Sequence, residues 1–317
     1  MLRRRPLGMV GRAGVLWYPS RMAPAPISER LQAGALRAFA AGMRALGPVR
    51  ASNLGGWVGR NVGPRLRRSR VADANLLAAM PEMDAPTRAG VVRAVWESLG
   101  RTMGELPFIA ELKRTEAGPG WELEGEEHVR AVMGGQWMFV AGHLGNWEMM
   151  LPAAAQYGVP SSGFYRAPSN RAVDRFMLEL RLRAIGPHAT MFAKGSDGAR
   201  AAMKHMAKGG SLGLLVDQKL NDGVAVPFFG RPAMTATAMA QLALRYKCVV
   251  LPARMVRIGP ARFRLVVEGP LTVPLTGDRH ADVYALTLAM NQVLERWIRE
   301  DPGAWLWLHR RWPKEAG

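Results

Sequence analysis

Short apolar runs alternate with amphipathic stretches along most of the chain. Runs rich in β-branched and aromatic residues and bounded by glycine, proline or polar residues are typical of buried strands, whereas apolar residues three to four positions apart are typical of helices. From Trp137 onward the pattern predicts strands at 137–141, 162–165, 190–192, 211–216, 248–256 and 262–267, and helices at 146–156, 170–184, 197–208, 235–246 and 282–300. A Gly- and Pro-rich loop is expected before Thr235. This alternation predicts an α/β fold with a mainly parallel sheet flanked by helices.

Upstream of this region, helices dominate the prediction. A strand at 121–124 and a helix at 126–133 follow two expected helices, one over 74–80 and one beginning near Ala85. The first amphipathic helix is predicted over Ile27 to Leu46, with Ser28 as its expected N-cap and Gly47-Pro48 as its expected end. Arginines interrupt its apolar face, so we expect a helix that lies on a membrane surface rather than one that spans it.

The positive charge is concentrated at the N-terminal end. Residues 1–70 hold fourteen arginines and one acidic residue, which supply thirteen of the net charge of +18. A basic arm with interspersed apolar residues, as at 7–18, favours attachment to an anionic membrane, and the sequence is therefore divided into an attachment arm, 1–70, and a domain, 71–317. The arginines at 65–70 would suit nucleic-acid phosphates equally, but we expect no nucleic acid as partner. Because Arg12 interrupts the first apolar stretch, no signal peptide is predicted and the cytoplasmic side is expected.

Absent motifs exclude several kinds of chemistry. The sequence has no G-x-S-x-G nucleophile motif, no P-loop and no pair of Cys or His residues at zinc spacing, so no metal or cofactor is expected. The lone cysteine, Cys248, lies in an apolar run and is interpreted as a core residue rather than a nucleophile.

One segment combines a strand end with acid–base side chains. His143 follows the strand at 137–141, and Glu148 lies in the first turn of the next helix, for which Asn146 is the expected N-cap. A turn between strand and helix lets side chains five positions apart converge, and a carboxylate beside an imidazole raises its basicity. We therefore predict that His143 is a general base oriented by Glu148.

Other polar residues lie at the same predicted edge of the sheet. In a parallel sheet, sites gather at the carboxyl ends of the strands, where Arg166, Asp217 and Gln218 are found. Arg166 is expected to hold an oxyanion or an anionic substrate group, and Asp217 to orient Arg166 or Lys219 or to cap a loop. Asn146, Asp217 and Gln218 are expected to bind the substrate at this edge.

A second predicted feature is an anion site at the start of a helix. Thr235 and Thr237 are expected to open the helix at 235–246, with Arg231 beside its free N–H groups. A histidine base with no neighbouring serine or cysteine nucleophile favours direct transfer, in which the base deprotonates an acceptor hydroxyl that attacks an activated donor.

These residues also carry a resemblance. H-L-G-N-W-E at 143–148, Y-R-A-P-S-N, V-D-Q, V-P-F-F-G-R-P-A-M-T-A-T and the terminal W-L-W-L-H-R-R-W occur in an order that resembles the bacterial lipid A biosynthesis acyltransferases, over roughly Asn75 to Trp312. The resemblance implies a fold like that of the glycerol-phosphate acyltransferases, acyl carrier protein as donor and a lipid A precursor as acceptor. It assigns His143 as base, Glu148 as its orienter and Arg166 as stabiliser of the thioester oxyanion or a substrate phosphate.

The expected setting is the cytoplasmic face of the bacterial inner membrane. Two alternatives stay open at this point: acylation of another membrane lipid, such as a lysophospholipid or aminolipid, and a non-catalytic basic binding protein. The tail at 305–314, rich in Arg and Trp, either receives the acidic carrier protein or is a packed terminus.

Overall fold

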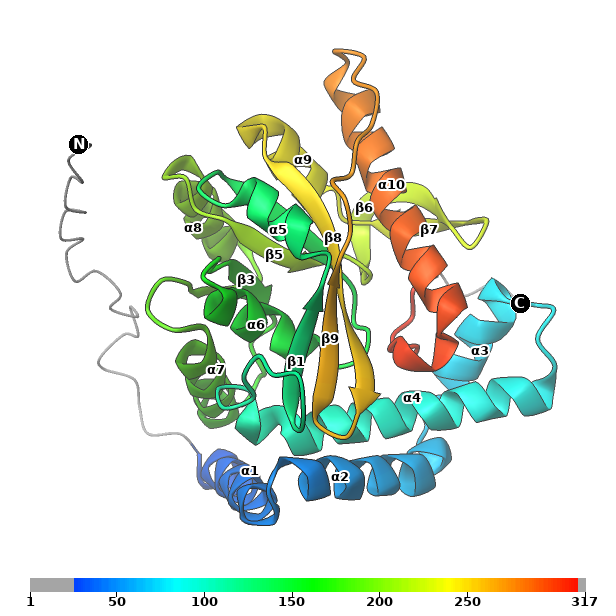
Figure 1. The fold of residues 1–317 in the computed structure, drawn as a ribbon. Coiled ribbons are helices and arrows are strands. Elements are labelled where there is room, and N and C mark those ends of the chain that lie inside the picture. Colours follow the sequence, from blue (N-terminus) through cyan, green and yellow to red (C-terminus); the bar gives the residue numbers. More distant parts are fainter. Residues whose placement is uncertain (1–25, 313–317) are drawn as a thin grey trace, which may run out of the picture.

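A sheet of seven strands forms the centre of the computed structural model, which describes residues 26–312 (Figure 1). The strand order is β1-β9-β8-β2-β5-β3-β4, and every neighbouring pair is parallel except β8 and β9. The strands are β1 (Gly120–Glu124), β2 (Trp137–Ala141), β3 (Ser162–Tyr165), β4 (Met191–Ala193), β5 (Leu212–Leu215), β8 (Val249–Gly259) and β9 (Arg262–Val267). The predicted mainly parallel α/β sheet is confirmed.

Helices cover both faces of the sheet. They are α1 (Ile27–Leu46), α2 (Pro48–Val62), α3 (Ser69–Ala79), α4 (Ala85–Glu105), α5 (Glu126–Val132), α6 (Met150–Tyr157), α7 (Arg171–Ile185), α8 (Ser196–Ala207), α9 (Ala238–Tyr246) and α10 (Arg279–Glu300). Short 3-10 helices are η1 (Gly63–Arg65), η2 (Leu106–Phe108), η3 (Trp147–Met149) and η4 (Pro302–Ala304). The predicted helix at 146–156 is thus split into η3 and α6.

The central strand β2 explains why its sequence is apolar throughout. All five of its residues are buried, because alternate side chains enter two different cores. Met138 and Val140 pack with side chains of α3, α4, α8, α9 and α10, whereas Trp137, Phe139 and Ala141 pack with those of η2, α5 and α6. A continuous apolar run is the pattern expected of a strand covered on both faces.

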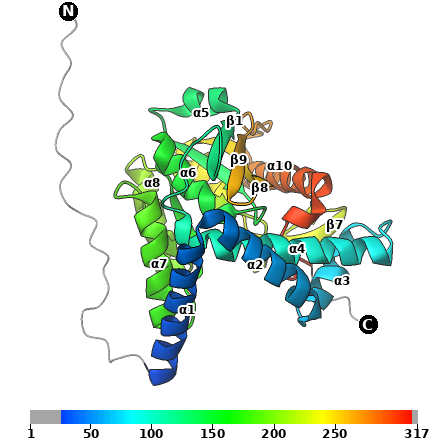
Figure 2. The ribbon, with the colours of Figure 1, turned by 60° about the horizontal axis from the view of Figure 1, so that its bottom comes forward.

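The N-terminal helices lie against the domain (Figure 2). Helix α1 packs on α7, and α2 runs along α4, where a Cβ atom added to Gly55 or to Gly100 would lie 2.1 Å from the other residue's carbonyl oxygen. The helix predicted over Ile27 to Leu46 ends before Gly47-Pro48 as expected, and Pro48 then begins α2. Ser28 lies inside α1 rather than capping it, since the residue before the helix is Pro26. The apolar residues at 7–18 lie outside the described residues, and the division at residue 70 stays a prediction.

The Gly- and Pro-rich segment before Thr235 is a β-hairpin, so the predicted loop was wrong. Strands β6 (Lys219–Phe228) and β7 (Arg231–Thr235) pair antiparallel around Phe229 and Gly230, which both have positive φ. Two such residues form the tight turn that suits hairpin twist. Phe229 tolerates this backbone because its ring is buried against Trp307 and Trp312.

The C-terminal segment after α10 is part of the core. Trp305, Trp307 and Trp312 are almost fully buried and join the same core as α3 and α10. This supports the packed-terminus interpretation of the tail over residues 305–312. Cys248 packs on that core as expected, and burial raises the pKa of its thiol to about 11.

Candidate active site

His143 lies just past the carboxyl end of β2, in a loop that the tail holds in place. Leu144 forms an isolated bridge with Trp305, and the His143 carbonyl accepts a hydrogen bond from the Leu306 N–H at 3.0 Å. The side chain of His143 keeps 16% of its surface exposed. The imidazole is therefore fixed by its surroundings and still open to solvent on one side.

Asp217 is the direct partner of His143. Strands β2 and β5 are neighbours with Ala141 opposite Leu215, so the residues two positions further on meet at the same edge of the sheet. The Asp217 carboxylate accepts hydrogen bonds from His143 Nδ1 and from the His143 backbone N–H, both at 2.8 Å, and from Trp305 Nε1 at 2.7 Å. Three donors hold this buried carboxylate in one orientation.

The pair sets the protonation of the imidazole. Burial opposes charge on both groups, but attraction between them prevails, so the pKa of His143 is raised and the pKa of Asp217 falls to about 2. An ionised carboxylate at Nδ1 keeps a proton on that nitrogen, which leaves Nε2 of the neutral ring as the base. Gln218 Nε2 lies 3.4 Å from this Nε2, a position consistent with a weak donor to it.

Glu148 does not form the predicted hydrogen-bonded pair with His143. Both of its oxygens bind Arg181 of α7, at 2.6 and 2.9 Å, because the turn after His143 directs Glu148 toward that helix. Its charge still contributes to the raised pKa of His143. The orienting position that the sequence assigned to Glu148 is thus occupied by Asp217, and Glu148 acts on the ring from a greater distance.

Arg166 follows the end of β3 and is exposed at the same edge of the sheet. Its charge acts on His309, a tail residue whose ring centroid lies 6.5 Å from that of His143. Burial lowers the pKa of His309, and the charges of His143, Arg68 and Arg166 lower it further. Arg166 therefore lies within electrostatic range of the His143 site, and its predicted role stays a prediction.

Two of the predicted substrate-binding residues are buried in the framework instead. Asn146 precedes η3 without capping it, and its Nδ2 donates to the buried Glu105 at 2.8 Å. Thr235 ends β7 rather than opening a helix, since α9 begins at Ala238, and its hydroxyl accepts from Arg311 at 2.7 Å. Thr235 therefore does not open the helix as predicted, whereas Thr237 immediately precedes α9, and the anion site expected at this helix start stays a prediction.

Arg311 is a functional candidate that the sequence did not indicate. Its guanidinium is fully buried, donates to Thr235 and to the Met234 carbonyl, and lies over the Phe228 ring. Burial lowers its pKa to about 10, while the negative charge of Asp217 acts in the opposite direction. Arg311 also lines the narrow cavity that His143 and Asp217 line, and its positive charge favours the ionised state of Asp217.

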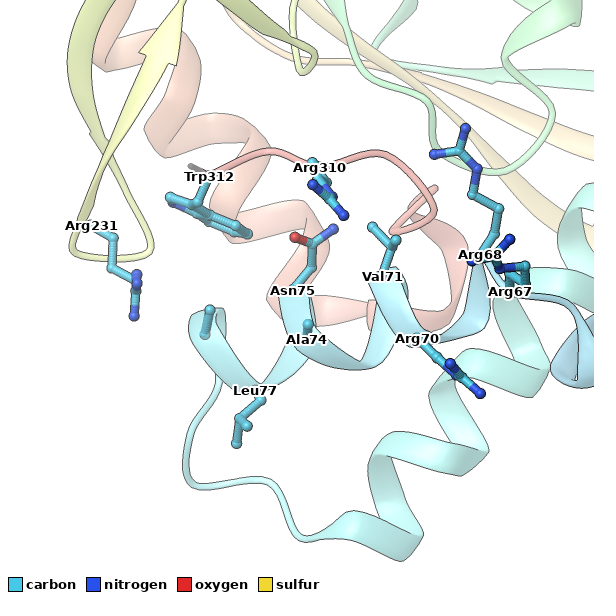
Figure 3. A pocket seen from close by; sticks show the side chains of 11 residues that line it. Arg67, Arg68, Arg70, Val71, Ala74, Asn75, Leu77, Arg231, Arg310 and Trp312 are labelled. Atoms are coloured by element: carbon cyan, nitrogen blue, oxygen red, sulfur yellow. The ribbon is translucent and has the colours of Figure 1, made fainter. Parts of the chain in front are cut away.

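Two cavities share Arg310 in their linings, and the narrower one borders the imidazole. A narrow one of about 10 Å³ has His143, Asp217, Gln218 and Trp305 on its walls, together with His309 and Arg310. A larger one of about 770 Å³ lies between α3, the β6–β7 turn and the tail, and is lined by Arg231 among other arginines (Figure 3). Within residues 26–312, no group of three His, Cys, Asp or Glu side chains is placed to hold a metal ion.

Comparison with known proteins matches residues 31–314 to the family model of bacterial lipid A biosynthesis acyltransferases. The lipid A biosynthesis lauroyltransferase of Escherichia coli strain K12 is 26% identical over 253 residues, which cover 77% of this chain and 79% of that protein. Among solved structures, the 1-acyl-sn-glycerophosphate acyltransferase PlsC from Thermotoga maritima has 12% identity and a TM-score of 0.38, covering 86% of this chain and 97% of its own. The family match begins at residue 31, so it includes most of α1 and all of α2.

Proposed function

The chain belongs to the bacterial lipid A biosynthesis acyltransferase family, and we propose that it transfers a fatty acyl chain from the thioester of acyl carrier protein to a hydroxyl of a lipid A precursor. The observation that carries this proposal is the pairing of His143 with Asp217, 2.8 Å apart, at the open edge of the sheet. An imidazole fixed by a buried carboxylate, with Nε2 directed toward a cavity, is a general base for a hydroxyl. The same pair argues against a non-catalytic binding protein.

The proposed reaction proceeds through one tetrahedral intermediate. Nε2 of His143 removes the proton of the acceptor hydroxyl while its oxygen attacks the thioester carbonyl carbon. The carbonyl π electrons move onto oxygen, and Arg166 and the Gln218 amide are the proposed partners of that oxyanion. When the C–O double bond re-forms, the C–S bond breaks and the thiolate takes the proton from the imidazolium. The products are the acyl ester and the free thiol of the carrier protein.

Asp217 stabilises the imidazolium that forms during this reaction. Its charge favours the protonated ring, which accounts for the raised pKa of His143. Glu148 adds to the same potential, and its ion pair with Arg181 fixes where that charge lies. In this proposal Asp217 is the close orienter and Glu148 the more distant contributor.

The proposed attachment to the cytoplasmic face of the inner membrane is supported by α1 and α2. In residues 26–312 no helix has the length and apolarity needed to cross a bilayer. Large apolar side chains are nevertheless exposed along the outer side of these two helices, including Ile27 at 75% and Trp57 at 59%, with Arg30, Arg37 and Arg50 among them. This combination is typical of helices that lie in the membrane interface.

The donor and acceptor are tested by one panel of assays. Purified protein is given a radiolabelled acyl chain as the thioester of acyl carrier protein or of coenzyme A. The acceptor is a lipid A precursor, a lysophospholipid or an aminolipid. We expect labelled product with the carrier protein and the lipid A precursor. Transfer to the lysophospholipid or aminolipid alone would replace the proposed acceptor, and faster transfer from coenzyme A would replace the proposed donor.

Attachment is tested by flotation with vesicles that contain phosphatidylglycerol. The double variant Trp57→Ser/Val58→Ser removes exposed apolar side chains of α2, whereas Asn53→Ser/Asn61→Ser, on exposed positions of the same helix, is the control. We expect only the first variant to stay unbound. Equal binding of both variants would contradict the assigned membrane face.

A further inference from the structure

The larger of the two cavities is lined by arginines from separate parts of the chain. Arg67 and Arg68 come from the turn before α3, Arg70 from its first turn, Arg231 from the β6–β7 turn and Arg310 from the tail. Figure 3 shows Arg231 on one side, Arg67 and Arg68 on the other, and Arg310 between them. Among residues 26–312, the lining of this cavity of about 770 Å³, which we call the arginine cavity, includes no acidic side chain. Its lining favours an anionic ligand.

Arg67, Arg68 and Arg310 differ from neighbouring arginines in their partners. Arg88 and Arg101 of α4 bind Asp73 and Glu97 at 2.9 and 2.7 Å. In the described part of the chain, by contrast, Arg67, Arg68 and Arg310 form no ion pair with a carboxylate. Like charges gathered without acidic partners repel one another, so their placement costs stability that a bound anion would recover.

The arginine cavity adjoins the reaction centre. Arg310 lines both this cavity and the narrow one in front of His143. The Arg68 charge acts on His309, whose ring lies 6.5 Å from that of His143. A group held among these arginines therefore lies beside the cavity that His143 lines.

An apolar surface leads into the same cavity. Helix α2, with its exposed apolar side, ends at Val62, and η1 leads on to the arginines, with Val62 and Leu66 both exposed on the way. Leu77 of α3 lines the cavity and is 48% exposed. An anionic headgroup whose hydrocarbon chains continue along α2 into the membrane fits both surfaces at once, whereas a free anion uses only the arginines.

We propose that the arginine cavity binds a phosphate monoester in the headgroup of the acceptor lipid and thereby presents a headgroup hydroxyl to His143. The fork of donors on each guanidinium matches phosphate oxygens, and two such contacts discriminate a doubly charged monoester from a singly charged diester. This inference rests on the proposed acyl transfer for its purpose, but the binding it describes is measured without any reaction.

The first experiment compares vesicles that carry phosphatidic acid, a monoester, with vesicles that carry phosphatidylglycerol, a diester, at equal surface charge. The variant is Arg67→Gln/Arg68→Gln. The control is Lys208→Gln/Arg279→Gln, which removes the same charge from exposed positions outside the cavity lining. We expect wild type and control to bind the monoester vesicles about tenfold more tightly than the diester vesicles, and the variant to bind both alike. A preference that survives in the variant, or is absent from wild type, overturns the proposal.

Two further measurements distinguish a lipid phosphate from a free anion, and failure of the binding site from failure of the proposed acyl transfer. Inorganic phosphate that abolishes the preference at submillimolar concentration would assign the cavity to a free anion and overturn the headgroup proposal. In the transfer assay, the variant is expected to raise the KM for a phosphorylated acceptor about tenfold, with kcat and the KM for the donor changed less than about threefold. If wild type transfers no acyl chain but prefers monoester vesicles, the proposed function fails while the binding site stands.

Discussion

Replacing Asp217 by asparagine removes the charge beside His143 and keeps the shape of the side chain. Asp217 accepts hydrogen bonds from His143 Nδ1, the His143 N–H and Trp305 Nε1. An amide offers one acceptor oxygen and turns an NH₂ group toward at least one of these donors. The imidazole then loses either its fixed orientation or its proton on Nδ1. In both cases Nε2 no longer serves as a base in most molecules.

The expected loss is large. A positioned general base contributes about 10²- to 10⁴-fold to a rate, and loss of the orienting carboxylate in a comparable hydrogen-bonded set costs about 10⁴-fold. We therefore expect kcat of Asp217→Asn to fall about 10³-fold or more, which corresponds to about 4 kcal/mol in activation free energy. The control is Asp222→Asn, an exposed acid on β6, with an expected change under about threefold.

The pH profile makes the test specific for His143. In wild type, kcat/KM rises with pH as the imidazole loses its proton, through a pKa raised above 6.5 mainly by Asp217, which acts against burial. Without the carboxylate that pKa falls, so the rising limb of the variant moves to lower pH while the plateau drops. Activity within tenfold of wild type, or an unmoved limb, in a variant with native melting behaviour would refute the role assigned to Asp217.

Three further predictions concern stability, measured as the free energy of unfolding in urea. Gly100→Ala places a methyl group against the α2 backbone and is expected to cost about 1–3 kcal/mol; Gly90→Ala on the same helix meets open space and is expected to gain about 0.5–1 kcal/mol. Glu105→Gln leaves Arg257 without its charged partner beneath the His143 loop, for an expected cost of about 3–5 kcal/mol, whereas the exposed Glu82→Gln is expected to change stability by less than about 0.5 kcal/mol. The pKa of Asp217 is about 2 in the folded protein against an ordinary value of 3.8, so its ionisation stabilises the fold above pH 3.8. That contribution is lost as pH falls toward 2, so wild type is expected to lose about 2 kcal/mol more than Asp217→Asn between pH 4.5 and 2; parallel curves would contradict the buried ion pair.

The sheet followed from the sequence because its central strands are covered on both faces. Continuous apolar runs such as Trp137–Ala141 need no tertiary information to be recognised, and the predicted limits of β2, β3 and β9 agree with the structure. The β6–β7 hairpin was not predictable in the same way. Its turn uses Phe229 at φ 53°, which an isolated chain disfavours and which the tryptophan-rich tail stabilises by burying the ring.

The site was predicted in part, for a related reason. The rule that polar residues gather at strand ends placed His143, Arg166, Asp217 and Gln218 at one edge of the sheet. It did not say which carboxylate contacts the imidazole. Local spacing favoured Glu148, five positions away, whereas pairing of β2 with β5 brings in Asp217, 74 positions away.

Buried polar residues of the site were the hardest to predict. Arg311 was missed because arginine is rarely buried, and only the contacts of the folded tail reveal its partners. Asn146 and Thr235 were both predicted at helix starts, where their residue types are common. Their actual partners, Glu105 and Arg311, lie far away in the sequence.

The most direct test of the account is acyl transfer by wild type and His143→Ala, measured side by side. The donor is acyl carrier protein loaded with a radiolabelled acyl chain, and the acceptor is a lipid A precursor. His188→Ala, an exposed histidine outside the site, is the control, and melting curves verify that all three proteins are folded. The account predicts product with wild type and the control, and a loss of about 10³-fold or more with His143→Ala. Turnover by folded His143→Ala within tenfold of wild type would contradict it.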